Sequence, residues 1–259
     1  MNQKNILILD TSTDACTLAL LAHGEIFTFH ELGKLRHNQL LIPGIQELLN
    51  QAQIKPTDLQ EIYFGHGPGS FTGTRISAAL AMGLAMGANI KPQSLSSFEL
   101  LAQGIYNNFG FSHVLILQDA QKNQAYLAGY EFINHEINTL ISPCLINPAQ
   151  ILEKLSPHDI VSPQVDRVGA DLRVRPAGED REGDKFLDLP WSGTGNAWFL
   201  LQDKLQNILP DIKNLTFNPQ AENWQPRAED GFELIIQNKI YPPEINYLRE
   251  ASDWLISKI

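Results

Sequence analysis

The sequence is poor in the residue types that build metal centres and disulfide scaffolds. It has two cysteines, Cys16 and Cys144, which stand far apart and outside any C-x-x-C pattern. Its seven histidines stand at positions 23, 30, 37, 66, 113, 135 and 158, so no two of them are three or four residues apart. These spacings argue against a zinc ribbon and a helical histidine pair. Sparse cysteine is typical of a reducing compartment, and we expect a cytoplasmic location.

Positive charge is also scarce. The chain of 259 residues carries 19 Lys and Arg against 29 Asp and Glu, a formal net charge of −10. Such a surface repels phosphate backbones on average, so direct binding of nucleic acid by this chain alone is not expected. The hydrophobic fraction of 43% is enough for one large core or two modest ones.

Long hydrophobic runs are missing as well. Lys4 precedes a short apolar run that stops at Asp10, too short for the core of a signal peptide or for a membrane span. The longest weakly polar stretch, residues 76–90, is interrupted by glycine and alanine. We therefore expect no contact with a membrane.

The hydrophobic pattern predicts the same group of elements twice. Strand-like runs cover residues 6–10, 17–22 and 25–30, and again 114–119, 124–131 and 137–141. A helical pattern follows each trio, at 40–50 with Pro43 near its start and at 149–154 with Pro148 before it. This duplication predicts an α/β fold of two lobes, 1–108 and 109–259, each a mixed sheet flanked by helices.

Other elements complete the two halves. A further strand is predicted at 62–65, and helices at 71–86, 97–107, 197–208, 228–237 and 250–257. Residues 164–187 interrupt the pattern, because they are rich in charge and poor in apolar anchors. Acidic residues outnumber basic ones there, which favours a surface insertion over a basic nucleic-acid tag.

The most informative stretch links the predicted strand at 62–65 to the helix at 71–86. This motif loop consists of Gly67, Pro68, Gly69, Ser70, Phe71, Thr72 and Gly73. Exposed N–H groups at a helix start can bind an anion. The loop lacks the Lys-Ser/Thr pair of a P-loop and the G-x-G-x-x-G spacing, so a turn that packs closely is an equally good interpretation.

The helix after the motif loop is nearly bare of bulk on one side. Ala79, Gly83 and Gly87 recur every four residues, beside further alanines at 81, 85 and 88. Another helix could approach this side closely, either within the same domain or from another subunit. The sequence leaves both alternatives open.

These features occur together in one known family. DTSTDACTLAL, RHNQLLIPGIQELL, FGHGPGSFTGTRISAALAMGLAMG, DAQKNQAYLAGY, SGTGNAW and INYLRE follow one another as in the TsaB family, also called YeaZ, which the chain resembles. The resemblance covers nearly the whole chain except residues 164–187. It implies the ASKHA fold, the duplicated architecture of actin, Hsp70 and sugar kinases.

The resemblance also implies a non-catalytic subunit in the formation of tRNA N6-threonylcarbamoyladenosine. It would bind and activate TsaD, which transfers threonylcarbamoyl from threonylcarbamoyl-AMP to the adenosine next to the anticodon, with TsaE in the larger complex. Pairing would use the helices at 40–50 and 75–87. The implied interface residues are Leu40, Leu41, Ile45, Leu48, Arg75, Ala79, Gly83 and Gly87. A homodimer through the same surface is an alternative, and tRNA is expected only through the complex.

The resemblance places the metal and ATP on TsaD and predicts no cofactor on this chain. TsaD has two metal-binding histidines in an N-H-L-E-G-H stretch, and the matching residues here, 96–101, read SSFELL. ATP-hydrolysing relatives have a glycine-rich second phosphate turn, whereas Asp119 is followed by bulkier residues at 121–123.

Two short stretches keep open alternatives. Asp10, Thr11, Ser12 and Thr13 are either a vestigial phosphate turn or a hairpin turn satisfied by its own hydroxyls. Residues 193–195, Gly-Thr-Gly, are either a remnant of a nucleotide loop or a turn from strand to helix.

The alternative function is an enzyme, either an ATPase or sugar kinase of this fold or a peptidase that acts on its partner. Ser12 and Ser70 are the available hydroxyl nucleophiles. No G-x-S-x-G elbow is present and no histidine is placed beside them by the sequence, so a Ser-His-Asp triad is conjecture.

Overall fold

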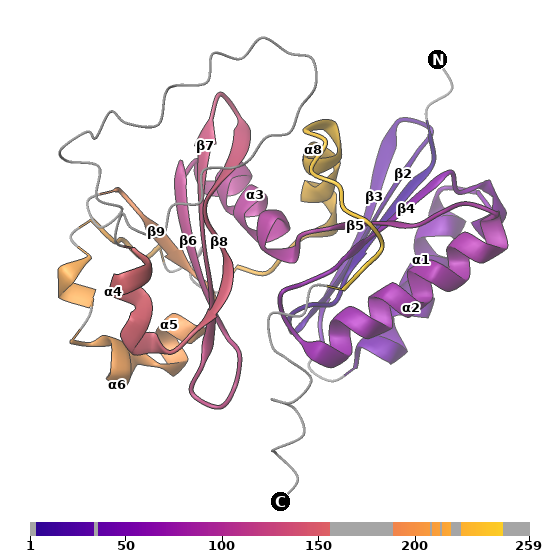
Figure 1. Ribbon diagram of the computed structural model, residues 1–259. Coiled ribbons are helices and arrows are strands. Elements are labelled where there is room, and N and C mark those ends of the chain that lie inside the picture. The colour runs from indigo at the N-terminus through magenta and orange to yellow at the C-terminus, as the bar shows by residue number, and fades with distance from the viewer. Residues whose placement is uncertain are drawn as a thin grey trace, which may run out of the picture.

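Two mixed β-sheets lie side by side in the computed structural model (Figure 1). The structure describes residues 4–33, 36–155, 189–207, 209–212, 214–218 and 224–245. The predicted insertion at 164–187 and the predicted helix at 250–257 lie outside these residues. Among the described helices none is long and apolar enough to cross a membrane.

The first sheet has the strand order β3-β2-β1-β4-β5. Its strands are β1 (Ile6–Asp10), β2 (Ala15–Ala22), β3 (Glu25–Leu32), β4 (Glu61–Gly65) and β5 (Gln93–Leu95). β1 pairs antiparallel with β2 and parallel with β4, so Ile8 lies between Ala19 and Tyr63. Strand β1 is buried along its whole length, because neighbouring strands and helices enclose it on every side.

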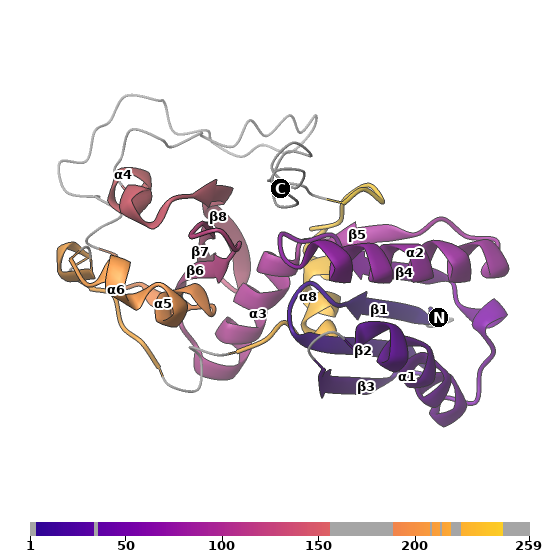
Figure 2. The ribbon, with the colours of Figure 1, turned by 90° about the horizontal axis from the view of Figure 1, so that it is seen from below.

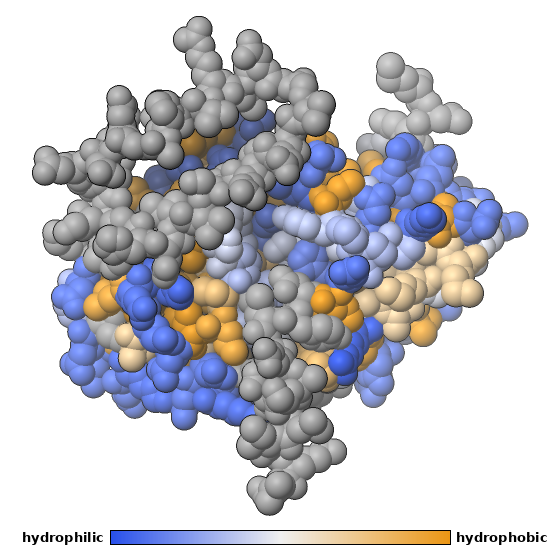
Figure 3. All heavy atoms as spheres, in the orientation of Figure 1, coloured by the Kyte–Doolittle hydropathy of each residue, from blue (hydrophilic) through white to orange (hydrophobic). Residues whose placement is uncertain are grey.

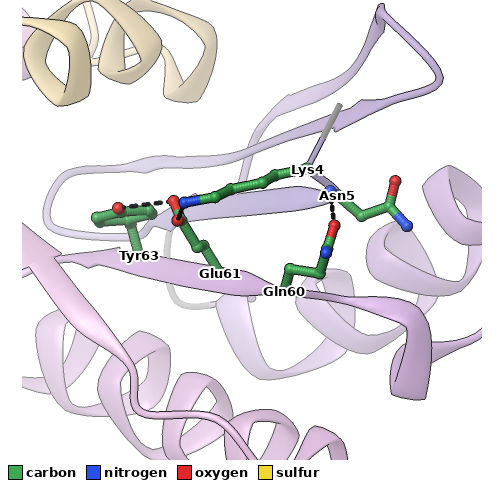
Figure 4. A network of polar contacts seen from close by, with 5 residues as sticks. All are labelled: Lys4, Asn5, Gln60, Glu61 and Tyr63. Atoms are coloured by element: carbon green, nitrogen blue, oxygen red, sulfur yellow. Dashed lines mark hydrogen bonds and ion pairs between the residues drawn. The ribbon is translucent and has the colours of Figure 1, made fainter. Parts of the chain in front are cut away.

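Polar contacts join the beginnings of β1 and β4, at the end of the sheet opposite the motif loop (Figure 4). The ammonium group of Lys4 pairs with the Glu61 carboxylate, which also accepts a hydrogen bond of 3.0 Å from the Tyr63 hydroxyl. The backbone N–H of Asn5 donates to the Gln60 side chain at 2.9 Å. These contacts support the parallel register of β1 and β4.

Helices α1 (His37–Gln51) and α2 (Phe71–Ala88) cover one face of the first sheet (Figures 1 and 2). Leu7 and Leu9 of β1 point to this side and join a core with the buried faces of both helices. The prediction that Pro43 lies near the start of α1 is wrong, because the helix already begins at His37 and Pro43 lies inside it. Next to it, Gly44 brings α1 close to the side chains of Leu18 and Phe29.

The second sheet repeats the connectivity of the first. Its order is β8-β7-β6-β9, with β6 (His113–Asp119), β7 (Ala125–Ile133), β8 (Glu136–Ile146) and β9 (Ser192–Thr194). β6 pairs antiparallel with β7 and parallel with β9, as β1 does with β2 and β4. The predicted duplication is therefore confirmed.

Short helices cover the outer face of the second sheet. They are α4 (Ile151–Lys154), α5 (Ala197–Leu200) and α6 (Gln202–Leu205), with 3₁₀ turns η2 (Pro148–Gln150) and η5 (Leu209–Asp211). The single helix predicted at 197–208 is thus two short helices that meet at Leu201. Trp191 is the largest fully buried side chain of this layer and packs among Leu115, Leu117 and Leu127.

Helix α3 (Ser97–Phe109) and helix α8 (Gly231–Ile236) lie between the two sheets (Figures 1 and 2). Ile8 from β1 and Ile116 from β6 face this shared core, since alternate residues of a strand point to opposite faces. Ser96 caps α3 by accepting the N–H of Glu99 at 3.3 Å. The central core therefore joins both halves of the chain.

The C-terminal part of the described chain returns to the first sheet. At the start of the 3₁₀ turn η6 (Ala228–Asp230), the backbone N–H of Ala228 donates a hydrogen bond of 2.9 Å to the Thr17 hydroxyl on β2. Farther on, Tyr241 forms an isolated antiparallel bridge with Ser94 on β5. The division of the chain at residue 108 stays a prediction.

Candidate partner-binding surface

The motif loop closes the start of α2 onto the turn that follows β1. The Ser70 hydroxyl caps α2 by accepting the N–H of Gly73 at 3.1 Å. The Ser70 N–H donates to the Ser12 carbonyl at 2.6 Å, and the Thr11 hydroxyl donates to the Gly73 carbonyl at 2.8 Å. The loop and the turn are therefore a single packed unit.

Glycine is required where these two segments meet. A Cβ atom at Gly69 would lie 2.3 Å from the Ser12 carbonyl oxygen, and one at Gly73 would lie 1.8 Å from the Thr11 carbonyl oxygen. Both distances are far below van der Waals contact with backbone atoms that cannot swing away. The glycines of the motif loop thus allow close packing, which agrees with the second of the two interpretations of the loop.

Asp10 lies at the centre of this unit. One of its carboxylate oxygens accepts the N–H and the hydroxyl of Ser12 at 2.8 and 2.7 Å, and the other accepts the Ser97 hydroxyl at 2.5 Å. Burial raises the pKa of Asp10, while hydrogen bonds from Ser97 and Ser12 and the nearby His37 act in the opposite direction. The carboxyl group organises the turn from β1, the loop and the start of α3.

The turn at residues 10–13 is closed by the chain itself. Asp10, Thr11 and Ser12 are fully buried and Thr13 is half-buried. The Ser12 N–H and hydroxyl are both used by Asp10, and the Thr13 hydroxyl accepts the N–H of Ala15 at 3.2 Å. These contacts agree with a hairpin turn satisfied by its own polar groups.

The counterpart turn of the second lobe, between β6 and β7, is bulky. Gln121, Lys122 and Asn123 all adopt left-handed backbone angles, with φ of 63°, 51° and 60°. The Asp119 N–H donates to the Asn196 side chain at 2.8 Å. Of the stretch at 193–195, Gly193 and Thr194 belong to β9, and only Gly195, with a left-handed φ of 99°, lies between this strand and α5.

The two available hydroxyls, Ser12 and Ser70, both make hydrogen bonds within the turn and the helix start. The Ser12 hydroxyl donates to Asp10, and the Ser70 hydroxyl accepts a backbone N–H. In a Ser-His-Asp triad a histidine takes the proton of the serine, whereas these hydrogen bonds of Ser12 and Ser70 are with Asp10 and Gly73. Within the described ranges, no three or more His, Cys, Asp or Glu side chains gather as they would around a metal ion.

The row of α2 that carries the two glycines faces solvent, whereas Ala81 and Ala85, also expected on the bare side, are buried in the core of the first lobe. Arg75, Ala79, Gly83 and Gly87 are all exposed, and a Cβ atom at Gly83 or Gly87 would meet nothing within 4 Å. Within the part of the chain that the structure describes, no residue packs on these two glycines, which favours the subunit alternative over the intrachain one. The Arg75 guanidinium lies 3.5 Å from the centre of the Phe71 ring and is the sole charge on α2.

Exposed apolar side chains extend this surface. Met82 is 42% exposed and Met86 83% exposed, on the same side of α2 as the glycines. Figure 3 shows the weakly hydrophobic strip over α2, next to strongly hydrophilic residues. Ile42, on the outer side of α1, is 53% exposed. None of these three residues is among the interface residues that the resemblance implies, although Met82 and Met86 are the large side chains beside the two glycines of α2.

The predicted interface residues of α1 need a correction. Leu41, Ile45 and Leu48 are 1%, 3% and 0% exposed and pack into the core of the first lobe. They have no surface to offer a partner. Leu40 is half-buried and packs against the same core. The candidate surface is therefore the exposed row of α2: Arg75, Ala79, Met82, Gly83, Met86 and Gly87.

Comparison with known proteins identifies the family. A family model described as tRNA N6-adenosine threonylcarbamoyltransferase, TsaD, matches residues 31–225. The tRNA threonylcarbamoyladenosine biosynthesis protein TsaB of Buchnera aphidicola subsp. Baizongia pistaciae is 31% identical over 243 residues, which are 92% of this chain and 91% of that protein. The chain belongs to the TsaB family.

Other relatives agree with this family. The TsaB protein of Escherichia coli is 37% identical over 126 residues, and that of Haemophilus influenzae is 36% identical over 128 residues. The matched region spans about half the length of these two relatives, 54% of each.

A solved structure shows the same fold. YeaZ from Pseudomonas aeruginosa superposes with a TM-score of 0.68 at 23% identity, covering 95% of this chain and 100% of that one. Together with the family match and the repeated sheet topology, this likeness fits the duplicated ASKHA-type fold expected from the sequence.

Proposed function

We propose that this chain is a non-catalytic subunit in the formation of tRNA N6-threonylcarbamoyladenosine, and that it binds and activates TsaD. The exposed row of α2 carries the proposal. In a chain with several relatives named TsaB, this row presents two glycines that no described residue covers and two exposed methionines. Transfer of threonylcarbamoyl from threonylcarbamoyl-AMP to the tRNA adenosine then takes place on TsaD, with TsaE in the larger complex.

The chemistry of the row suits a helix from a partner protein. Glycine and alanine let two helix backbones approach closely, and methionine adapts its flexible side chain to an irregular surface. Charge is confined to Arg75 at one end, so little desolvation opposes the contact. A second copy of this chain could use the same row, which makes a homodimer the competing occupant.

Reconstitution tests the division of labour. Purified chain with tRNA and threonylcarbamoyl-AMP should form no modified adenosine, because no described side chains are arranged for the transfer. Adding TsaD, TsaE and ATP should restore the product, measured by chromatography of digested tRNA, and leaving out this chain should remove it. Turnover by this chain alone would overturn the proposal.

Nucleotide binding gives a second test. Calorimetry of the isolated chain with ATP and Mg²⁺ should give only heats of dilution, because the turn at 10–13 is closed by its own hydrogen bonds and the turn at 121–123 is bulky. The same titration into a complex with TsaD should give saturable heat. Saturable binding to the isolated chain would favour the ATPase alternative.

A further inference from the structure

The C-terminal segment, residues 239–245, is attached to the edge of the first sheet. Tyr241 exchanges two backbone hydrogen bonds with Ser94 of β5, at 2.9 and 3.0 Å. The Ser94 hydroxyl donates to the Pro242 carbonyl at 2.7 Å. In Figures 1 and 2 this segment passes beside β5 after leaving α8. It therefore extends the sheet at the strand next to β4.

Tyr241 reaches from this segment to the start of the motif loop. Its ring packs edge-on against the ring of His66, with centroids 5.0 Å apart. His66 directly precedes Gly67, and its Nδ1 lies 3.1 Å from the Ser94 hydroxyl. Gly67 in turn exchanges hydrogen bonds of 3.0 Å with Ser97, through its N–H and its carbonyl. Direct contacts thus connect Tyr241 with the loop from which α2 begins.

The other end of the Tyr241 side chain is bound to a buried carboxyl group. Its hydroxyl donates to the Glu99 Oε1 atom at 2.9 Å. Glu99 lies in the first turn of α3, is 4% exposed, and its Oε2 atom has no hydrogen-bond partner among the described residues. Tyr241 and Lys239 from the C-terminal segment and Tyr130 from β7 face this carboxyl group.

Burial sets the protonation of this cluster. It raises the pKa of Glu99 to about 7, against the opposing effects of the Tyr241 hydrogen bond and the Lys239 charge. Burial also lowers the pKa of His66 to about 4, so His66 stays neutral near pH 7. Glu99 is therefore the member of the cluster whose charge changes in that range.

We propose that Tyr241 is a positioning residue for the partner surface: it holds His66 and Ser94, and through them the motif loop, so that α2 presents its exposed row in a fixed orientation. The motif loop carries the Ser70 cap of α2 and the Ser70 N–H that binds the turn at 10–13, so a looser loop lets the helix tilt. The link to a partner rests on the proposed function, whereas the link to the loop does not.

Tyr241→Phe tests the positioning role in the isolated chain. The change removes the hydroxyl but keeps the ring on His66. Hydrogen exchange of the amides at 66–74 should become about tenfold faster, because the Glu99 carboxyl group loses the hydrogen bond from Tyr241 and the segment opens more often. Unchanged exchange at 66–74 would overturn the proposal.

Tyr106→Phe is the matched control. Tyr106 lies on α3, as Glu99 does. Its ring stacks on Phe132, and its hydroxyl forms a hydrogen bond with the exposed side chain of His135. Removing this hydroxyl should leave exchange at 66–74 unchanged. If Tyr106→Phe accelerated exchange there as much as Tyr241→Phe, the effect would be general loosening and the proposal would fail.

The pH dependence separates positioning from a merely structural role. Because the pKa of Glu99 is raised, the closed segment favours the protonated carboxyl group, and its stability is lost as the pH rises through about 7. Hydrogen-exchange protection of the amides at 66–74, corrected for the intrinsic exchange rate, should therefore fall as the pH rises through about 7. In Glu99→Gln this protection should no longer depend on pH in that range. A Glu99→Gln variant with unchanged pH dependence would contradict the proposal.

Asp230 provides the control for this pH range. Burial raises its pKa to about 7 as well, but it accepts a hydrogen bond from Asn107, at the far end of α3 from Glu99. Asp230→Asn should therefore keep the pH dependence at 66–74. If Asp230→Asn removed it, Glu99 would not be the responsible group.

The affinity for TsaD tests the link between the motif loop and the partner surface. Tyr241→Phe should weaken binding to TsaD about tenfold in a titration below pH 7, while Tyr106→Phe binds like the wild type. If exchange at 66–74 changes but no variant, nor the wild type, binds TsaD, then the proposed function fails and the positioning role stands. If TsaD binds all three equally, the loop does not set the partner surface.

Discussion

Gly83→Leu should prevent stable pairing with TsaD while the isolated chain keeps its fold. A Cβ atom at position 83 would meet none of the described residues within 4 Å, and leucine favours a helix more than glycine does. A partner helix lying on the row, in contrast, would be pushed outward by the added side chain. We expect the dissociation constant to rise about 100-fold, or about 2.7 kcal/mol, by titration calorimetry.

Gln202→Leu is the control for this prediction. Gln202 is exposed at the start of α6 in the second lobe, so the change adds the same side chain to a different surface. It should bind TsaD like the wild type. The Tm of Gly83→Leu should stay within a few degrees of the wild-type Tm, because a change of about 1 kcal/mol in the free energy of unfolding shifts the Tm of a chain this size by about 2–4 °C.

Two outcomes would contradict the prediction. Wild-type affinity of Gly83→Leu for TsaD would show that the row of α2 is not the surface that TsaD uses. A change in the mass of the isolated chain, measured by light scattering, with no change in TsaD binding would assign the row to a homodimer instead.

The repeated pattern of strands could be predicted because each strand carries its own signal. Strand β1 was predicted with the bounds it has, and α2 differs by two residues at its end. Strand β5 was missed, because its three residues, Gln93–Leu95, are mostly polar and become a strand only through pairing with β4 and Tyr241. Pairing of this kind depends on distant segments that no local pattern shows.

Of the predicted interface, the residues on α2 are exposed and most of those on α1 are buried, and the reason again lies in what a local pattern can show. Apolar residues at helical spacing mark the side of a helix that faces its own core, and Leu41, Ile45 and Leu48 are such residues. The row on α2 was found because small residues stand out where bulk is expected. The contact between Tyr241 and Glu99 joins residues 142 positions apart, so the sequence alone did not indicate it.

Gly73→Ala and Gly87→Ala should change the stability of the isolated chain in opposite directions, although both replace a glycine of α2 with alanine. The added methyl group at position 73 would lie 1.8 Å from the Thr11 carbonyl oxygen, so α2 has to move away from the turn at 10–13. That movement breaks the hydrogen bond from Thr11 to Gly73 and uncovers Asp10 and Ser12. We expect a loss of about 3 kcal/mol in the free energy of unfolding.

At position 87 the same methyl group meets nothing within 4 Å, and alanine loses less backbone entropy than glycine when a helix forms. Gly87→Ala should therefore raise the free energy of unfolding by about 0.5–1 kcal/mol, measured by urea unfolding of the variant and the wild type in parallel. Equal loss of stability in both variants would mean that glycine is needed throughout α2, and the distinction between a packed start and a free row would be lost. Opposite signs would show that this helix uses glycine for two purposes, close packing on its own turn at one end and an uncovered surface at the other.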